Sequence, residues 1–287
     1  MTSPSVADLI AGIPSSLGSY GPVLEEIEAA MNSPQSNLVT VGDAIEKDPD
    51  LTARLLRLAN SSFYGFSSRV GTVTEAISLI GVQQVEDLIL VSSVVERFAG
   101  VSAEGLSMKS FWRHSLAVGV AARLLASELK LPGMDKYFVA GMLHDIGRLV
   151  LLCEAPAWAE KVFSLHGRER VLLRDAETRV LGFDHQQIAA VLLKEWRYPG
   201  TLVEAVGCHH QPFMAQIAVE LASTVHLADY VVHALEIGAS GERFVPPLNA
   251  KACQKIRFHT GLLPSLVARI DEQIAAVEDV FLRSVRQ

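Results

Sequence analysis

Apolar residues recur at intervals of three and four positions along almost the whole chain, and this spacing constrains the fold more than any other feature of the sequence. Leu51, Leu55, Leu58 and Ala59, for example, would share one face of a helix. No segment between turns combines β-branched residues with the strict alternation of apolar and polar positions that a half-buried strand requires. The sequence therefore predicts an all-α fold, a helical bundle with no sheet of consequence.

Composition narrows the class of protein. The 287 residues are 49% apolar and 20% charged, which is enough to bury a substantial core as one large or two modest domains. The net charge of −7 argues against a general nucleic-acid surface, which needs clustered lysine and arginine. The longest charge-free run, 9–24, holds only 16 residues with two prolines and three glycines, so it is not expected to span a membrane.

The compartment is predicted from the termini and the cysteines. No basic segment precedes an apolar run at the N-terminus, so we expect no signal peptide. Cys153, Cys208 and Cys253 are odd in number and show no paired spacing. We interpret them as reduced, mostly buried thiols of a cytoplasmic protein.

The expected elements are helices separated by loops at 13–22 and 237–249. The loops are rich in glycine and proline, and Pro156 is expected to stop the helix that precedes it. The closing helix carries an apolar stripe that we expect to pack on the protein's own core: Leu266, Ile270, Ile274, Val277 and Phe281. The expected helices are 23–31, 43–46, 50–60, 72–80, 83–98, 107–130, 135–144, 149–153, 168–181, one opening at 185, 202–208, 215–235 and one opening at 265.

The adjacent residues His144 and Asp145 end the apolar run 137–143 and are followed by Gly147 and Arg148. On one irregular helical turn, both side chains can point into the same cavity. An imidazole nitrogen and a carboxylate oxygen suit a divalent transition metal. An isolated His-Asp pair is a weak signal, so the rest of the chain has to support it.

Further histidines and an aspartate lie in helical-looking segments at larger spacings: His114, His185, His209, His210 and Asp229. Taken with His144 and Asp145, their order resembles the HD superfamily of metal-dependent phosphohydrolases. The segment 192–199 also resembles the HD-GYP branch of that superfamily. The resemblance implies two ions, with Asp145 bridging them and the five imidazoles and Asp229 completing the set. Fe, Mn or Zn suits this mixed nitrogen and oxygen set better than Ca or Mg.

Three departures from the HD-GYP pattern bear on catalysis. Ser110 stands where those enzymes carry Glu, and Arg148 stands where they carry Lys. Arg148 could still contact a phosphate, with a different fork geometry, beside Asp145 in an active enzyme. Residues 211–213, Gln-Pro-Phe, replace the Glu and the Gly-Tyr-Pro element. The metal ligands are therefore expected to be retained, whereas the elements that grip a cyclic dinucleotide are altered.

The N-terminal part resembles a second family. Residues 47–61 and 73–81 are similar to the signature of the HDOD family, the HD-related output domain. That resemblance implies an HD-domain-like helical bundle and a bacterial signalling or regulatory role. We divide the chain into an N-terminal helical subdomain, 1–100, and an HD-like domain with a closing helix, 101–287.

Three functional hypotheses remain open. The preferred one is a signalling module with a metal-containing HD-like domain, which would contact other signalling proteins. The alternative is a metal-dependent phosphohydrolase acting on nucleotides or cyclic dinucleotides, so a nucleotide or phosphate ligand is possible; the third is a metal-free scaffold. The remaining histidines are interpreted as ordinary core or surface residues: His166, His226, His233 and His259. His226 has a second possible role as a partner of a metal ligand, and Arg54 and Arg57 are expected on a solvated helix face.

Overall fold

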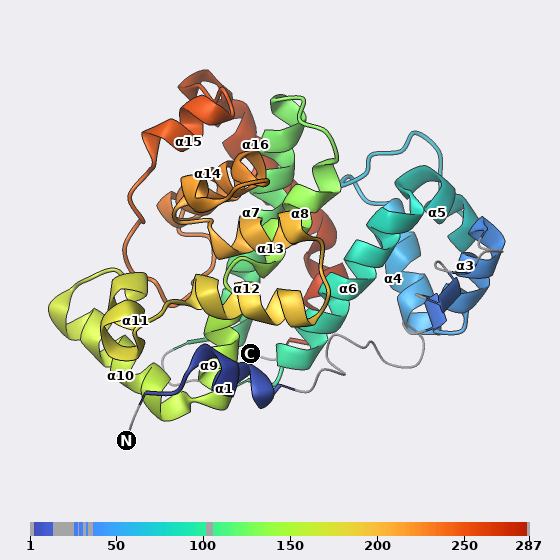
Figure 1. Cartoon of the computed structure of the whole chain (residues 1–287). Coiled ribbons are helices and arrows are strands. Elements are labelled where there is room, and N and C mark those ends of the chain that lie inside the picture. The colour runs from blue at the N-terminus through green and yellow to red at the C-terminus, as the bar shows by residue number, and fades with distance from the viewer. Residues whose placement is uncertain are drawn as a thin grey trace.

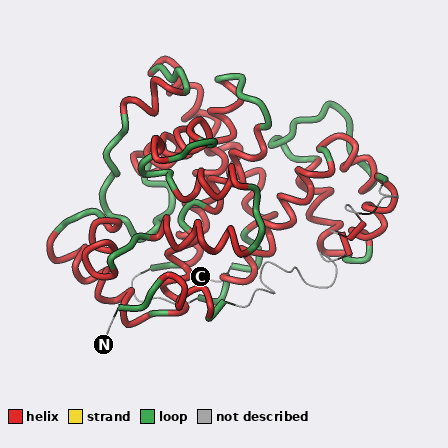
Figure 2. Tube along the Cα trace, viewed as in Figure 1, coloured by secondary structure: helices red, strands yellow, loops and turns green. Residues whose placement is uncertain are grey.

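The structure is a computed structural model that describes residues 3–13, 26–27, 29–30, 33, 37–101 and 106–285. In that part of the chain helices are joined by turns and loops, without a strand (Figure 2). The prediction of an all-α fold is confirmed. The elements are α1 (Val6–Ala11), α3 (Leu38–Glu46), α4 (Pro49–Ala59), α5 (Val73–Ile80), α6 (Val82–Phe98), α7 (Met108–Glu128), α8 (Met134–Leu143), α9 (Ile146–Glu154), α10 (Pro156–Glu169), α11 (Leu173–Leu181), α12 (His185–Glu195), α13 (Gly200–Gly207), η2 (Pro212–Met214), α14 (Val219–Ala234), α15 (Ala250–Lys255), η3 (Thr260–Leu262) and α16 (Leu263–Phe281).

Helices α3, α4 and α5 form a group at one end of the molecule, and α6 leads from it to the larger group (Figure 1). Local sequence explains the helix starts. Asp48 caps α4 by accepting hydrogen bonds from the backbone of Asp50 and Leu51, and Pro49 occupies the first helical position. Arg57 is exposed as expected, but Arg54 pairs with both Asp50 and Glu96 and is only 21% exposed. The expectation of a fully solvated face was therefore wrong for Arg54.

Helices α7 and α8 form the centre of the larger group. They approach closely because Gly119 and Gly141 face each other: a Cβ atom added to Gly141 would lie 2.6 Å from the Gly119 Cα. Large apolar residues fill the space on either side, among them the fully buried Phe111, Trp112 and Phe138. The close contact matters for function because His114 is on α7 and His144 directly follows α8.

Helix α16 packs against α7 and also reaches α4 and α6. Its stripe, Leu266 to Phe281, is buried, which confirms that this face covers the protein's own core. A hydrogen bond from Gln273 Nε2 to the Ser62 carbonyl, 3.0 Å long, ties α16 to the α4–α5 connection. Helix α1 lies against α9 and α12, apart from α3–α5 (Figure 1). A division near residue 100 therefore remains a proposal, with α1 outside the N-terminal group.

Helix α9 ends at Glu154, just before Pro156 as expected, but the sequence did not predict the helix that follows: Pro156 is the first residue of α10, where a missing N–H costs nothing. The expected helix 168–181 is divided, because Arg170 adopts a left-handed conformation with φ of 55° and α11 begins at Leu173. The expected loop 13–22 and helix 23–31 lie largely outside the described residues.

The cysteines are free, as expected, but they are not buried. Cys153 is exposed at the end of α9, and Cys208 and Cys253 are partly exposed. The buried face of α9 is occupied by other residues, such as Leu149 and Leu152, so Cys153 lies on the exposed face of this helix.

No single helix in the described segments has the length and apolar character needed to cross a membrane. Helices α5 and α6 pass such a test only jointly, and they are bent by 107° at Gly81. Gly81 adopts a φ of 102°, which favours glycine.

Candidate metal centre

Seven side chains from separate elements converge in the larger group of helices. His114 comes from α7, His144 and Asp145 from the α8–α9 turn, and Asp229 from α14. His185 is the first residue of α12, and His209 and His210 follow α13. His210 is partly exposed, whereas the other six are no more than 1% exposed.

Local features of the chain direct these side chains inward. Asp145 occupies the N-cap position of α9, yet its side chain does not cap the helix, so its carboxylate is available to the site. Gly147 lets α9 press against α12, since a Cβ atom there would collide with the carbonyl oxygen of His185. Asp184 fixes the start of α12 with a capping box that includes Gln187.

Three groups of ligand atoms each lie within 4.8 Å of one another, and His144, Asp145 and His209 form the group that links the other two. Those two share no residue: one is His114, His144 and Asp229, and the other is His185, His209 and His210. Asp145 lies between them: its Oδ2 is 3.2 Å from His144 Nε2, and its Oδ1 is 3.3 Å from His185 Nε2. This arrangement offers one carboxylate oxygen to each group.

The outer nitrogens of three imidazoles are held by acceptors. Nδ1 of His144 donates to the Gly141 carbonyl at 2.7 Å, and Nδ1 of His209 donates to the Val206 carbonyl at 2.8 Å. Nδ1 of His185 donates to Glu177 Oε2 at 2.6 Å. With Nδ1 as the donor, a neutral ring at each of these positions would present the lone pair of Nε2 to the interior, as histidine ligands of metals do.

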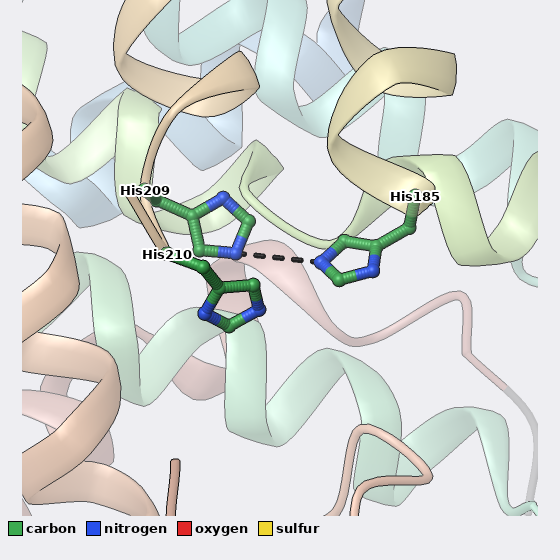
Figure 3. A group of neighbouring side chains, drawn as sticks. All are labelled: His185, His209 and His210. Atoms are coloured by element: carbon green, nitrogen blue, oxygen red, sulfur yellow. Dashed lines mark hydrogen bonds between the residues drawn. The ribbon is translucent and has the colours of Figure 1, made fainter. Parts of the chain in front are cut away.

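Two of these lone pairs face each other. His185 Nε2 and His209 Nε2 are 3.4 Å apart and both Nδ1 atoms are already donors (Figure 3). Several other inward atoms are buried and have no hydrogen-bond partner among the described residues, including His114 Nε2, His144 Nε2, Asp145 Oδ1 and His210 Nε2. Burying so many unsatisfied polar atoms is costly. A cation shared by them would satisfy all of them, so the residues fit a metal.

The electrostatics keep most of these groups in the form that binds a metal. Burial, together with neighbouring imidazoles, holds the pKa values of His209 and His210 well below the usual range. Burial opposes ionisation of Asp145, but Arg148 and His144 hold its pKa well below the usual range. His144 differs: burial lowers its pKa, yet Asp145 and Asp229 outweigh burial and raise it to about 10. A proton on His144 thus partly neutralises the carboxylates, and a bound cation would replace it.

Arg148 is buried and donates hydrogen bonds inside the protein through its Nε and NH1 atoms. It is 3% exposed, and its NH1 donates to Asp145 Oδ2 at 2.5 Å and to Ser240 Oγ at 2.9 Å. Its Nε donates to Glu177 Oε1 at 3.3 Å. The geometry makes Arg148 a residue that orients Asp145 and Glu177. Its expected phosphate contact stays a prediction.

Sequence reasoning missed Glu177 and Ser240, which no motif marks. It treated His233 as ordinary, although His233 Nδ1 lies 2.8 Å from Asp229 Oδ1 and its ring packs on His114. His226 does support the centre: its Nδ1 donates to the His209 carbonyl at 2.9 Å, and its Nε2 accepts from the backbone of Asn249 at 2.9 Å. In the sequence, the only sign that His226 and His233 belong to the site is that each lies within one helical turn of Asp229.

Similarity to known proteins agrees with this fold. An uncharacterised protein of Treponema pallidum (strain Nichols) is 25% identical over 235 residues, which cover 81% of this chain and 44% of that protein. The chain spans less than half the length of the curated relatives it matches. A crystal structure from Shewanella amazonensis SB2B, named only as a candidate phosphohydrolase, has a TM-score of 0.72 at 23% identity, covering 97% of this chain and 98% of that one.

A crystal structure from Marinobacter aquaeolei VT8, named as a candidate signal transduction protein, has a TM-score of 0.68 at 23% identity. It covers 90% of this chain and 58% of that one. These likenesses establish the fold. The family itself follows from the HDOD domain model, which matches residues 17–212, more than half of the sequence. The chain belongs to the HDOD family.

Proposed function

We propose that this chain is a bacterial signal-transduction module whose HD-like half holds two divalent transition-metal ions. The observation that carries the proposal is the convergence of five imidazoles and two carboxylates, several with buried atoms that have no hydrogen-bond partner among the described residues. His114, His144 and Asp229 would hold one ion, and His185, His209 and His210 the other. Asp145 would bridge them. When bound, such a pair supplies electrostatic stabilisation for anionic groups and activates water.

The comparisons support a regulatory role. The relatives with this fold include one named as a candidate for signal transduction, and its chain is longer than the match. A module that forms part of a longer signalling chain would contact other signalling proteins. The described N-terminal helices α3–α5 add no cluster of histidines or cysteines to the centre, so their contribution in this proposal is packing and contact.

Phosphohydrolase activity is the second candidate, because another relative with this fold is named as a candidate phosphohydrolase. The metal groups would suit that reaction. Against it, Arg148 is engaged with Asp145, Glu177 and Ser240, and the Gly-Tyr-Pro element is replaced at 211–213. We therefore place hydrolysis of cyclic dinucleotides below regulation.

The metal proposal is tested by elemental analysis of protein purified without chelator, beside the Asp145→Ala variant. We expect about two equivalents of Fe, Mn or Zn per chain for the native protein and a clear loss for the variant. A native protein that is folded but holds no transition metal, even after incubation with each ion, would remove the proposal.

The catalytic alternative has its own measurement, in which cyclic di-GMP is incubated with metal-loaded protein and the products are separated by chromatography. We expect hydrolysis to be absent or very slow. Turnover on the order of 1 per second or faster, abolished by Asp145→Ala, would favour the phosphohydrolase instead.

A further inference from the structure

A cavity of about 70 Å³ opens beside the metal centre. Its walls come from the start of α11, the turn after α13, helix α14 and the segment between α14 and α15, and they include Arg174, His210, His226 and Glu242. His210 belongs to the second ligand group, and its Nε2 is a buried atom without a hydrogen-bond partner among the described residues. The cavity therefore leads to the metal centre at His210.

Most polar groups of the cavity wall are already engaged. Glu242 Oε2 accepts a hydrogen bond from the backbone of Leu173 at 2.6 Å, and its Oε1 accepts from the backbones of Arg243 and Phe244 at 2.8 and 2.9 Å. Both carboxylate oxygens are thus covered by N–H groups, which offset its charge. His226 uses both ring nitrogens on backbone atoms.

Apart from His210 Nε2, the guanidinium of Arg174 is the charged group of the wall that is not engaged in this way. It makes no hydrogen bond to any residue in the described part of the chain, and its nearest carboxylate contact, Asp175 Oδ1, is 3.8 Å from NH2. The side chain is 22% exposed, so it is largely covered and yet reaches the cavity. An available guanidinium favours an anion, and its planar fork matches the oxygens of a phosphoryl group.

We propose that this cavity binds a small oxyanion, either free phosphate or the terminal phosphoryl group of a monoester, through Arg174 and next to His210. The assignment deepens the proposed function and rests on it in one respect: an ion held by His185, His209 and His210 would lie beside the bound group. Arg174 thereby takes the phosphate-binding role that the family resemblance suggested for Arg148, whose Nε and NH1 donate to other side chains.

The size of the cavity selects the ligand. An engineered cavity of about 150 Å³ holds benzene, with six heavy atoms, and this one has about half that volume. A phosphoryl group with its oxygens suits it, while the rest of a monoester would lie outside. The phosphates of a cyclic dinucleotide are diesters flanked by sugars on both sides, so neither can enter as a terminal group.

The test is calorimetric titration of the full chain with inorganic phosphate and, separately, with phenyl phosphate. The variants are Arg174→Gln, Arg174→Lys and a matched control, Arg179→Gln. Arg179 is on the same helix, is 54% exposed and pairs with Glu169 outside the cavity. We expect Arg174→Gln to weaken binding at least about tenfold, since a charge-assisted hydrogen bond is lost. Arg174→Lys should weaken it less, and Arg179→Gln should leave it unchanged.

The two ligands separate the possible sources. Binding of inorganic phosphate alone identifies the free ion, whereas comparable or tighter binding of phenyl phosphate identifies a monoester; both support the cavity. Cyclic di-GMP that displaces phosphate from the cavity would overturn the size argument. The proposal would be overturned if the native protein binds neither ligand at ligand concentrations on the order of 10 mM. It would also be overturned if the Arg174→Gln variant binds with the same affinity as the native chain.

Metal content measured on the same preparations separates this inference from the function on which it rests. If the protein contains no metal and its phosphate affinity still depends on Arg174, the cavity assignment stands and the metal proposal is wrong. If the protein contains metal and its phosphate affinity does not depend on Arg174, only the cavity assignment is wrong. Circular dichroism of each variant excludes unfolding as the cause of lost binding.

Discussion

At the scale of single residues, Glu177 connects the ligands to the rest of the molecule. Its Oε2 accepts hydrogen bonds from the His185 backbone at 2.9 Å and from His185 Nδ1 at 2.6 Å, and its Oε1 accepts from Arg148. Burial opposes its ionisation, but His185 and Arg148 together lower its pKa. The ionised carboxylate therefore fixes the ring orientation that turns His185 Nε2 inward.

Replacing Glu177 by Gln keeps the shape of the side chain but removes its charge and replaces one acceptor oxygen by an amide group, which is itself a donor. We expect metal affinity to fall by about 10–100-fold, as it does when partners of histidine ligands are removed. Competition with a chromophoric chelator measures this affinity. Glu169→Gln is the control, because Glu169 is exposed and pairs only with surface arginines. Equal affinity in both variants would contradict the positioning role.

A second residue-scale prediction concerns pH. Asp87 on α6 is half-buried, and burial raises its pKa to about 6, from 3.8 for the free side chain. The folded state thus binds more protons than the unfolded state between these two values, so this carboxyl destabilises the protein above pH 6 and the penalty disappears as pH falls to about 4.

Asp87→Asn should therefore raise the melting temperature at pH 7.5 by a few degrees, since about 1 kcal/mol corresponds to roughly 2–4 °C in a chain of this size. The gain should shrink towards pH 4. Melting curves at both pH values, with the exposed Asp43→Asn as control, check this. A gain that is equal at both pH values would contradict the assigned pKa.

The HD-like series in the sequence named seven side chains that lie close together in the structure, and their role as metal ligands stays a prediction. The series could not predict Glu177, because Glu177 and His185 lie on different helices and their contact depends on the turn between α11 and α12. Nor could it show that Arg148 is engaged, because its partner Ser240 is 92 residues away in sequence. Partners across the fold leave no local pattern.

At the scale of elements, the spacing between α7 and α8 sets the distance between His114 and His144, whose ring centroids are 5.5 Å apart. Gly141→Ala would place a methyl group against Gly119, and a well-packed contact responds to such overpacking with a loss of about 1–3 kcal/mol. Metal content should fall as well, because the first ligand group is pulled apart.

Gly167→Ala provides the matched control for Gly141→Ala. Gly167 is also helical, in α10, but its added Cβ would meet only the end of the Arg243 side chain at 3.5 Å. Removing a helical glycine there should be neutral or stabilising by about 0.5–1 kcal/mol. Urea unfolding measures both variants. Similar free energies of unfolding for the two variants would show that the α7–α8 contact accommodates a methyl group, and the overpacking argument would then be wrong.

Helix positions were predicted well where apolar spacing is strong, as in α7 and α16, and poorly around α10. A proline can end one helix and begin the next, as Pro156 does between α9 and α10, and only the first of these was predicted. The left-handed position between α10 and α11 is occupied by Arg170 and not by glycine, so nothing in the sequence indicated the break between these helices. These errors lie at helix ends, where tertiary contacts decide.

At the scale of the whole molecule, the metal centre is expected to stabilise the fold. Its ligands come from α7, the α8–α9 turn, α12, the turn after α13, and α14. Two metal ions bound there would therefore cross-link helices that are distant in sequence. Without a cation, the unpartnered atoms of this centre would remain buried at a cost in free energy. Metal binding would therefore be coupled to folding, since the unfolded chain cannot present this arrangement.

Chelation should lower the melting temperature of the native protein. Metal at about 100 times its dissociation constant stabilises the folded state by about 2.7 kcal/mol, which corresponds to roughly 5–10 °C here. Asp145→Ala, which lacks the bridging carboxylate, should melt at nearly the same temperature with and without chelator. Differential scanning fluorimetry with EDTA, followed by excess Mn or Zn, measures the loss and its recovery. An equal response of the native chain and the variant would mean that the chelator acts elsewhere than at Asp145, and the bridging role would then fail.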